Sequence, residues 1–412
     1  MKLKKDIMII VIADDLTGAA EIAGIGHSYG LSTALLIDVA DNLPVCDLIV
    51  VATDTRSMTE QDAVNETHRI CQAIKLGLPK LTEARYAAMT PLKRAQAMAK
   101  QDDILHLFKK TDSALRGHVH LELRALIEES RYEQVMYMPA NPSMGRTIRG
   151  GRYFVNGLPI DQTDFSRDPE FPATTANVAA AIDVMPGSRL RICDAEDAQD
   201  VHRTVKMALN NRIPTLLAGA ADLFCAFLEE LGRKPTRAKS FHGLNEKGAA
   251  LIVCGSTQSI DLSSQPYVRR HNMASIPMPR EVFDNVTNQK ITPKEAADKW
   301  MGRLKQTQVV AGKTASFILT LPYPSSGTRE GALALRQVTG DMTQRIAKST
   351  TLSELIIEGG ATAHSAIKAL GWTRFHISNV IGPGIVRMQC LDATATHLTI
   401  KPGSYDWKDL FA

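Results

Sequence analysis

The chain has 412 residues, of which 44% are hydrophobic and 22% charged. These proportions are typical of a soluble globular protein, and the length is enough for two or three domains. The net charge of +4 is small for this length, and no run of basic residues argues for binding to nucleic acid or a membrane surface. No apolar run is long enough to cross a bilayer.

The N-terminal segment begins with basic residues, as a signal peptide does. Its apolar stretch, however, ends at Asp14 and Asp15 instead of at a cleavage site of small residues. We therefore expect a first β-strand here and a cytoplasmic protein. The six cysteines are dispersed, without metal-ligand spacing, and are expected to be buried and reduced.

Apolar segments alternate with amphipathic ones along the first half of the chain. This alternation predicts an α/β fold in which parallel strands are joined by right-handed helical crossovers. Strands are expected near 7–13, 32–37, 48–52, 104–108, 134–138, 189–193 and 214–217. Helices are expected near 16–29, 58–76, 118–130 and 196–209. Gly24 and Gly26 fall within the first helix, where glycines more often allow close packing than bind a dinucleotide.

Three of these strands run directly into charged clusters. Residues 14–18 follow the first strand, 53–57 follow the third, and 109–117 follow the fourth. Open parallel sheets bind ligands beyond the carboxyl ends of their strands, so the clusters are expected to form one active site. Carboxylates, lysines, arginines and hydroxyls together suit a small, polyhydroxylated, anionic substrate.

Residues 145–159 are dense in arginine and glycine. The Asn156-Gly157 pair is a strong two-residue turn motif, and we expect a protruding hairpin. One interpretation is a flap that brings arginines over a bound anion. The alternatives are a solvated hairpin and a dimer contact.

A polar, basic passage at 232–248 separates this half from a second apolar series. We place the domain boundary within it, giving domains 1–240 and 241–412, each a largely parallel sheet flanked by helices. In the second domain, strands are expected near 250–254, 315–319, 353–357 and 396–400. Helices are expected near 258–269, 292–306, 328–347 and 361–370.

The strand ends of the second domain are rich in glycine and almost uncharged. Glycine lets a backbone approach a phosphate closely, and the helix beginning near Thr362 offers unpaired N–H groups. The pattern therefore predicts a phosphate-binding site. Residues 311–314 resemble the end of a P-loop but lack its first glycine and precede a strand, so we reject that interpretation. The glycine-rich loops lie at 254–257, 358–363, 381–384 and 401–404.

Taken in order, these blocks resemble the four-carbon acid sugar kinases, a family long known only as a domain of unknown function. The blocks are IADDLTGAAEIAG, ATDTRS, KKTDSALRGH, PANPSMGRTIRGGRYFVNGLPIDQTDF, CGSTQS, GGATA, GPGI and KPGS. The resemblance implies an N-terminal sugar-acid domain, a C-terminal nucleotide domain and an active site in the cleft between them. It also implies ATP-dependent phosphorylation of the terminal hydroxyl of threonate, erythronate or an oxo-tetronate. Ala361 departs from the pattern, since the family usually has an acidic residue there.

Phosphoryl transfer needs an aligned acceptor, charge neutralisation and a carboxylate that accepts the hydroxyl proton. We expect Asp15 to be that base, with Asp14 binding a second hydroxyl or exchanging roles with it, because adjacent strand residues point to opposite faces. The expected substrate-binding residues are Asp14, Arg56, Lys110, Asp112, Ser113 and Arg116. The expected nucleotide-binding residues are Ser256, Gly359, Gly360, Ala361, Thr362, Gly382, Gly384 and Gly403.

Magnesium is expected to arrive with ATP and not in a dedicated protein cage. Two other classes of function stay open: a sugar-acid aldolase or dehydratase, and a non-catalytic sensor of a sugar acid or nucleotide. Sequence does not decide which four-carbon acid or epimer is used, and it leaves a homodimer open.

Overall fold

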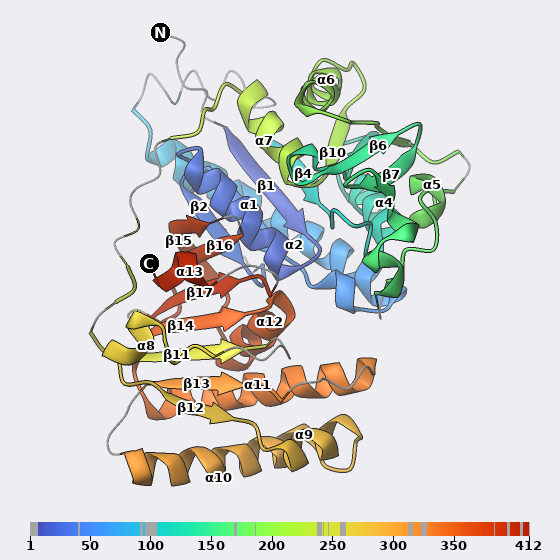
Figure 1. Cartoon of the computed structure of the whole chain (residues 1–412). Helices are drawn as coiled ribbons and strands as arrows, with labels where there is room; N and C mark the ends of the chain where they lie inside the picture. Colours follow the sequence, from blue (N-terminus) through green and yellow to red (C-terminus); the bar gives the residue numbers. More distant parts are fainter. Residues whose placement is uncertain are drawn as a thin grey trace. The chain divides into compact units, whose positions relative to one another are not determined.

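The computed structural model describes most of the chain (Figure 1). The chain forms two compact units, Met1–Arg237 and Ala238–Ala412. The described residues are 7–39, 42–90, 94, 105–168, 171–185, 187–236, 241, 243–245, 247–255, 261–311, 316–322, 328–382, 384–393, 396–403 and 407–411.

The main sheet of the first unit follows the strand order β2-β3-β1-β4-β10-β5-β9, and every pairing in it is parallel. All six residues of β1 are buried, as its unbroken apolar sequence predicts for a central parallel strand. The strands are β1 Met8–Ala13, β2 Thr33–Leu36, β3 Leu48–Ala52, β4 Leu105–Lys110, β5 Gln134–Met138, β9 Leu190–Ile192 and β10 Thr215–Gly219.

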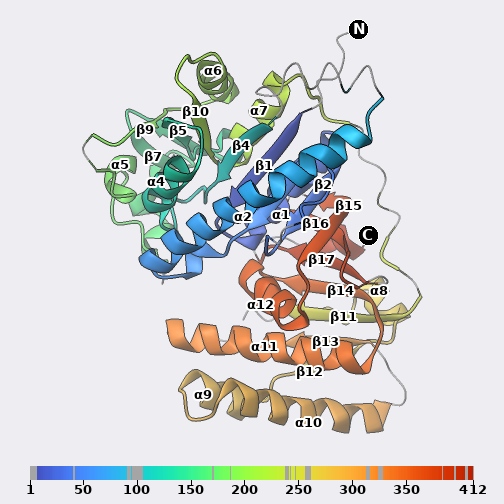
Figure 2. The same ribbon diagram turned by 180° about the vertical axis from the view of Figure 1, so that it is seen from behind.

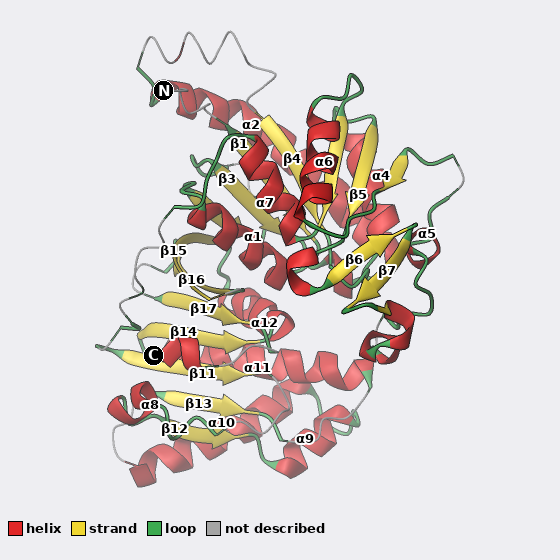
Figure 3. Cartoon of the chain, turned by 45° about the horizontal axis from the view of Figure 1, so that its top comes forward, coloured by secondary structure: helices red, strands yellow, loops and turns green. Residues whose placement is uncertain are grey.

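Helices cover both faces of this sheet. Helices α1, α7 and α6 contact one another in series and cover the face turned toward the viewer in Figure 3, whereas α2 and α4 cover the face seen in Figure 2. The α-helices are α1 Leu16–Ser28, α2 Glu60–Ala87, α4 Val119–Glu129, α5 Val178–Ala181, α6 Ala198–Leu209 and α7 Ala221–Glu230. The short 3-10 helices are η1 Thr55–Ser57, η3 Pro142–Met144, η4 Ile160–Gln162 and η5 Asp164–Arg167.

The expected strands and helices of this unit are present, with two differences. Helix α2 continues well past the expected end at residue 76, through Pro79, because Gly77 and Leu81 are buried against the unit. Helix α7 was missed, although its buried residues Leu223, Phe224, Phe227 and Leu228 have helical spacing. Close packing explains Gly26, because a methyl group there would collide with the Leu48 side chain.

The arginine- and glycine-rich segment forms a small antiparallel sheet of β6 (Arg146–Arg149), β7 (Arg152–Val155) and β8 (Leu158–Pro159). Asn156 and Gly157 form the turn between β7 and β8 with φ values of 49° and 83°, which confirms the predicted turn. The hairpin does not protrude, however. Its side chains Ile148 and Tyr153 are fully buried, and Ile148 pairs with Ala195 through backbone hydrogen bonds.

The second unit follows the strand order β12-β13-β11-β14-β17-β16-β15, in which only β16 is antiparallel to its neighbours among the described strands. The strands are β11 Ala249–Cys254, β12 Ala274–Pro277, β13 Phe317–Thr320, β14 Leu352–Glu358, β15 Arg374–Gly382, β16 Ile385–Cys390 and β17 His397–Lys401. The helices are α8 Pro266–Arg270, α9 Arg280–Thr287, α10 Pro293–Ala311, α11 Arg329–Ser349, α12 Gly360–Leu370 and α13 Lys408–Phe411.

The α/β fold class is confirmed, but the sequence missed β12, α9 and the β15–β16 hairpin. Strand β12 is short and β15 is partly exposed, so polar residues interrupt the apolar pattern of both. The helix expected near 258–269 is present only at its C-terminal end within the described residues. Residues 261–265 form a turn, and α8 begins only at Pro266, whose fixed φ favours the first helical position.

The connections define a switch point in each sheet. In the first unit the chain leaves β1 toward β2 on one side and leaves β4 toward β5 on the other. In the second unit it leaves β11 toward β12 and β14 toward β15. Ligands of open α/β sheets bind where neighbouring strands diverge in this way, beyond their carboxyl ends. The crevices at β1/β4 and β11/β14 are therefore the candidate sites.

Most of the cysteine side chains lie in the interior of the protein. All six cysteines are free and five are buried, and burial raises the pKa of Cys71 to about 11 and that of Cys46 to about 12. The expected burial is confirmed for five of the six, and Cys225 is half-buried. No helix in the described part of the chain is both long and apolar enough to span a membrane.

Gly219 at the end of β10 is expected to tolerate no side chain. A methyl group there would collide with the Met138 carbonyl oxygen and lie 2.9 Å from the Leu223 side chain. We expect Gly219→Ala to lower the free energy of unfolding in urea by roughly 1–3 kcal/mol. Gly302→Ala is the control, because nothing lies within 4 Å of its added methyl group and alanine favours the α10 helix. Equal unfolding midpoints for the two variants would contradict this packing argument.

Candidate active site

Three parallel strands bring the charged clusters of the first unit together. Ala13 of β1 is in register with Ala52 of β3 and with Lys110 of β4. The residues that follow these strands therefore leave the sheet at the same level and on the same edge. This proximity is what the sequence predicted for the clusters beginning at Asp14, Thr53 and Lys109.

Arg56 is the centre of this group. Its Nε and Nη2 both lie 2.9 Å from Asp14 Oδ2. Nη1 lies 3.1 Å from Asp15 Oδ2, and Nη2 lies 3.0 Å from Asp15 Oδ1. Nη2 also lies 3.6 Å from Asp112 Oδ1. The residue before η1, Asp54, has a φ of 56°, which turns the chain so that Arg56 faces the β1 end. Arg56, which follows β3, therefore binds carboxylates that follow the other two strands, β1 and β4.

Asp14 and Asp15 occupy different environments, as adjacent residues at a strand end should. Asp15 caps α1, where its Oδ1 accepts a hydrogen bond of 2.9 Å from Gly18 N, and its side chain is 19% exposed. The Asp14 side chain is only 2% exposed, and its Oδ1 has no hydrogen-bond partner among the described residues. Burial raises the pKa of Asp14 to about 6; Arg56 opposes that rise and Asp15 adds to it.

Asp112 and Arg116 form a two-point ion pair within the loop after β4. Arg116 Nε and Nη2 donate to the two Asp112 oxygens at 2.8 and 3.0 Å, and Arg116 Nη1 lies 3.4 Å from Asp168. Burial alone would raise the pKa of Asp112, but Arg56 and Arg116 hold it well below its usual value. Both oxygens of this carboxylate are thus already bound by cations.

The two lysines of the cluster have different partners. Lys109 and Glu122 of α4 are fully buried, with 2.5 Å between Nζ and Oε2, and Thr55 donates to the same oxygen at 2.8 Å. Lys110 Nζ donates to Thr111 O at 3.0 Å and lies 3.4 Å from Glu21. Glu122 was not among the residues expected at this site, although a glutamate among the apolar positions of a helix is a detectable sign of a buried partner.

The small sheet adds two further residues to this site. Arg146 of β6 donates to Ser113 Oγ, and the Tyr153 hydroxyl of β7 donates to Ser113 O. Ser113 is the residue after Asp112, so both contacts fix the loop that follows β4. Arg146 was expected only as part of an arginine-rich segment, because its position depends on how that segment folds back.

The glycine-rich loops of the second unit lie along one edge of its sheet. Strands β11, β14, β15 and β17 run in the same direction, so the loops that follow them share the carboxyl edge (Figure 3). Gly359 has a φ of 93°, precedes α12 and donates from its N–H to Lys401 O at 2.8 Å. Gly255 has no room for a Cβ, which would lie 2.6 Å from Glu358 O.

The other expected nucleotide residues are placed as follows. Gly360, Ala361 and Thr362 form the first turn of α12, and Thr362 is buried whereas Ala361 is partly exposed. Gly382 and Gly384 belong to the turn between the antiparallel strands β15 and β16, and Gly403 follows β17. Ser256 lies outside the described residues.

A buried ion pair underlies this edge. Lys401 Nζ donates to Glu358 Oε1 and to Pro402 O, both at 2.9 Å, and lies 4.8 Å from the centre of the Trp407 ring. Both charged side chains are almost completely buried. The pair therefore ties the ends of β14 and β17 together directly beneath Gly359.

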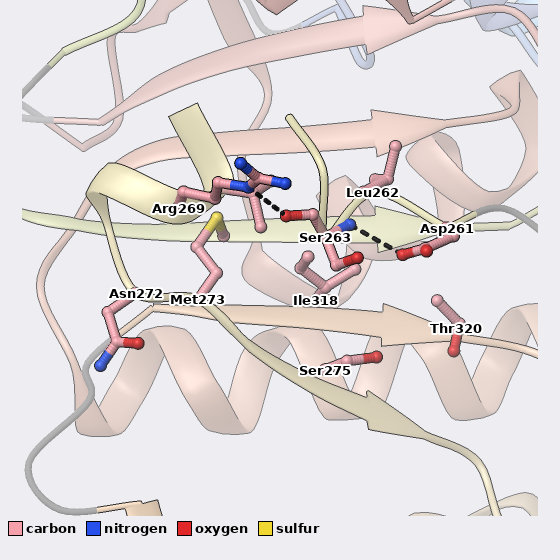
Figure 4. Close-up of a pocket in the computed structure, with 10 residues that line it drawn as sticks. Asp261, Leu262, Ser263, Arg269, Asn272, Met273, Ser275, Ile318 and Thr320 are labelled. Carbon is pink, nitrogen blue, oxygen red and sulfur yellow. Dashed lines mark hydrogen bonds between the residues drawn. The ribbon is translucent and has the colours of Figure 1, made fainter. Parts of the chain in front are cut away.

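A separate cavity of about 320 Å³ lies beside α8 in the second unit (Figure 4). Ser263 is at its wall, accepting a 3.3 Å hydrogen bond from Arg269 and donating one of 2.9 Å to Asp261. None of the described residues that we expected to bind nucleotide lines this cavity. Its residues form no motif, so the sequence analysis did not find it.

Comparisons with known proteins agree with this organisation. Residues 9–210 match the family model of a sugar-binding N-terminal domain. The chain is 23% identical to a D-threonate kinase of Salmonella typhimurium, over 92% of this chain and 90% of that protein. It is also 23% identical to a 3-oxo-tetronate kinase of Brucella melitensis, over 98% and 94% of the two chains.

A crystal structure of a Salmonella typhimurium LT2 protein shares the fold, with a TM-score of 0.70 at 19% identity and 98% coverage of both chains. At that identity the likeness concerns the fold alone. The protein therefore has an α/β fold whose N-terminal part matches the model of a sugar-binding domain. The chain is thus similar over nearly its whole length to proteins named as four-carbon acid sugar kinases.

The burial of Asp14 makes stability depend on pH. Its native pKa of about 6 lies above that of an unfolded aspartate, so the native state binds the proton more tightly. The stabilisation from Asp14 is present at low pH and is lost as pH rises from about 4 through about 6. Asp14→Asn cannot titrate. We expect the difference in unfolding free energy, wild type minus variant, to fall by about 1–2 kcal/mol between pH 5 and pH 7.5. A constant difference in urea titrations would contradict this.

Proposed function

We propose that the chain is an ATP-dependent kinase that phosphorylates the terminal hydroxyl of a four-carbon acid sugar such as threonate, erythronate or an oxo-tetronate. The single observation that carries the proposal is the pair of unlike strand edges: a charged crevice at the β1/β4 switch point and a glycine-lined one at the β11/β14 switch point. The names of the relatives, which align over nearly the whole chain, support the same activity.

On the acceptor side, Asp15 is the carboxylate that a substrate hydroxyl can reach, because it is partly exposed whereas Asp14 is buried. We assign Asp15 to orient this hydroxyl and accept its proton. Asp14 then acts by holding Arg56 in place. Lys110 is a point charge near the same edge and suits the transferring phosphoryl group.

On the donor side, the free N–H groups at the start of α12 and the positive end of its dipole favour phosphate oxygens. Gly359 and Gly360 leave the backbone accessible there, and the crowding at Gly255 requires glycine. We assign these residues, with Thr362 and the glycines after β15 and β17, to the nucleotide. Magnesium enters with ATP, since it retains waters and needs few protein ligands.

Transfer then requires little covalent chemistry from the protein. The γ-phosphoryl group passes directly to the acceptor oxygen once both are aligned, and cationic side chains offset the charge that accumulates on it. The acceptor proton moves to Asp15. No covalent enzyme intermediate is needed, in keeping with a site built from ion pairs.

Two other functions make different predictions. An aldolase or dehydratase acting on a sugar acid has no use for a phosphate-binding edge, so it would not bind ATP. A sensor of sugar acid or nucleotide would bind its ligand without turnover. ATP binding and turnover together therefore separate the three classes.

The first experiment is release of ADP from ATP and magnesium by the purified protein. The acids are both enantiomers of threonate and erythronate and the 2-oxo and 3-oxo tetronates, with a reaction lacking acid as the control. We expect acid-dependent ADP release with one or a few of them. Measurable ATP binding without turnover on any acid would favour the sensor.

Asp15→Asn tests the assigned base. Asparagine caps a helix as well as aspartate does, so we expect α1 and the overall stability to be retained. The value of kcat should fall about 100-fold or more, as for loss of a general base, whereas the Kd for ATP should stay within a few-fold of the wild-type value. Turnover close to wild type would rule out Asp15 as the base.

Gly359→Ala tests the phosphate edge, with Gly371→Ala as a matched control at the other end of α12. Both glycines have positive φ values, 93° and 71°, so both substitutions should destabilise the protein by about 1 kcal/mol. Only Gly359→Ala displaces the N–H groups assigned to phosphate, and we expect it to raise the KM for ATP roughly 10-fold or more. Equal KM values for the two variants would contradict the assignment.

A further inference from the structure

Most cations at the charged edge of the first unit already have carboxylate partners. Arg56 contacts Asp14, Asp15 and Asp112, and Arg116 contacts Asp112 and Asp168. The remaining pairs are Lys109 with Glu122 and Lys110 with Glu21. A substrate carboxylate binding to any of these side chains competes with a carboxylate of the protein.

Arg146 differs from all of them. Its guanidinium donates to the neutral Ser113 hydroxyl and lies over the Phe165 ring, 5.4 Å from the ring centre. No carboxylate of the described residues lies within ion-pair distance of it. A guanidinium has five N–H donors, so most of those of Arg146 remain available beside the loop that follows β4.

We infer that Arg146 binds the carboxylate of the acid substrate and is the residue that selects an acid over a neutral polyol. This inference rests on the proposed function. The uncompensated charge of Arg146 gives an anion a partner without displacing an internal ion pair. The planar fork of its guanidinium suits a carboxylate, which it binds at two points.

The surroundings of Arg146 hold it for this task. The guanidinium lies over the ring of Phe165, which favours a cation at that position. Buried Tyr153 ties the small sheet to Ser113 through its hydroxyl, and Ile148 pairs with Ala195 on the other side of the strand. The side chain is therefore presented by an anchored sheet, so little conformational entropy is lost when an anion binds.

A neutral tetritol has the same hydroxyls as the four-carbon acid but a CH₂OH group in place of the carboxylate. It gains nothing from the free charge of Arg146. Lysine keeps the charge but loses the two-point geometry and the stacking on Phe165. The inference therefore concerns discrimination between two substrates and predicts more than a general loss of activity.

The test compares kcat/KM for the preferred acid with that for the corresponding tetritol. We expect Arg146→Ala to lower the value for the acid roughly 10- to 100-fold, mainly through KM, and to leave the value for the tetritol within about 3-fold. For Arg146→Lys, the kcat/KM for the acid should lie between the values of wild type and Arg146→Ala. Arg149→Ala is the control on the same strand, because that exposed arginine pairs with Glu196, and its acid-to-tetritol ratio should match wild type.

Thermal unfolding and ATP binding check that each variant is folded. Where turnover of the tetritol falls below detection, the Kd of the acid by titration calorimetry takes its place, and Arg146→Ala should weaken it by the same factor. If Arg146→Ala leaves the acid-to-tetritol ratio of kcat/KM or the Kd of the acid unchanged, or lowers kcat/KM equally for both compounds, this inference is overturned and the proposed function stands. Wild-type protein that phosphorylates no acid overturns the proposed function and this inference with it.

Discussion

The charged edge of the first unit depends on one guanidinium shared by carboxylates. Asp14, Asp15 and Asp112 would repel one another at the ends of neighbouring strands if Arg56 were absent. Arg56 offsets this repulsion only because parallel register brings the ends of β1, β3 and β4 to one level. The cost of the arrangement appears at Asp14, whose burial outweighs the attraction of Arg56 and raises its pKa. Asp15, on the exposed side of the same arginine, is left oriented and accessible.

Each unit places a buried lysine–glutamate pair beneath the edge that holds its candidate site. Lys109 pairs with Glu122 in the first unit, and Lys401 pairs with Glu358 in the second. Buried ion pairs contribute little net stability, because desolvation offsets most of their attraction, but breaking one leaves an uncompensated charge. Their effect here is to fix strand ends. The charges exposed above them differ, and that difference separates an edge suited to a polyhydroxylated anion from an edge suited to phosphate.

Much of the fold was predictable because buried parallel strands have a distinctive sequence. The unbroken apolar run of β1 and the glycines of the second unit's loops indicated strands and loops without any knowledge of their neighbours. Elements without such a local pattern were not predicted. Edge strand β12 and hairpin strand β15 have polar residues among their apolar ones, and the extension of α2 beyond residue 76 depends on where Leu81 packs. Those properties come from neighbouring elements and not from the local sequence.

By itself, the sequence determined the α/β class, the charged and glycine-rich strand ends, and the Asn156-Gly157 turn, because each follows from local composition and backbone preference. Only the tertiary structure decided which charges are already paired. From sequence alone, Arg56 and Arg116 were equally good candidates for binding an anion. Both are bound by carboxylates of the protein, whereas Arg146 donates to Ser113 and has no carboxylate partner among the described residues. Ion pairing depends on distances of a few ångströms between side chains far apart in the chain, and those distances are set by strand register and by the folding back of the small sheet.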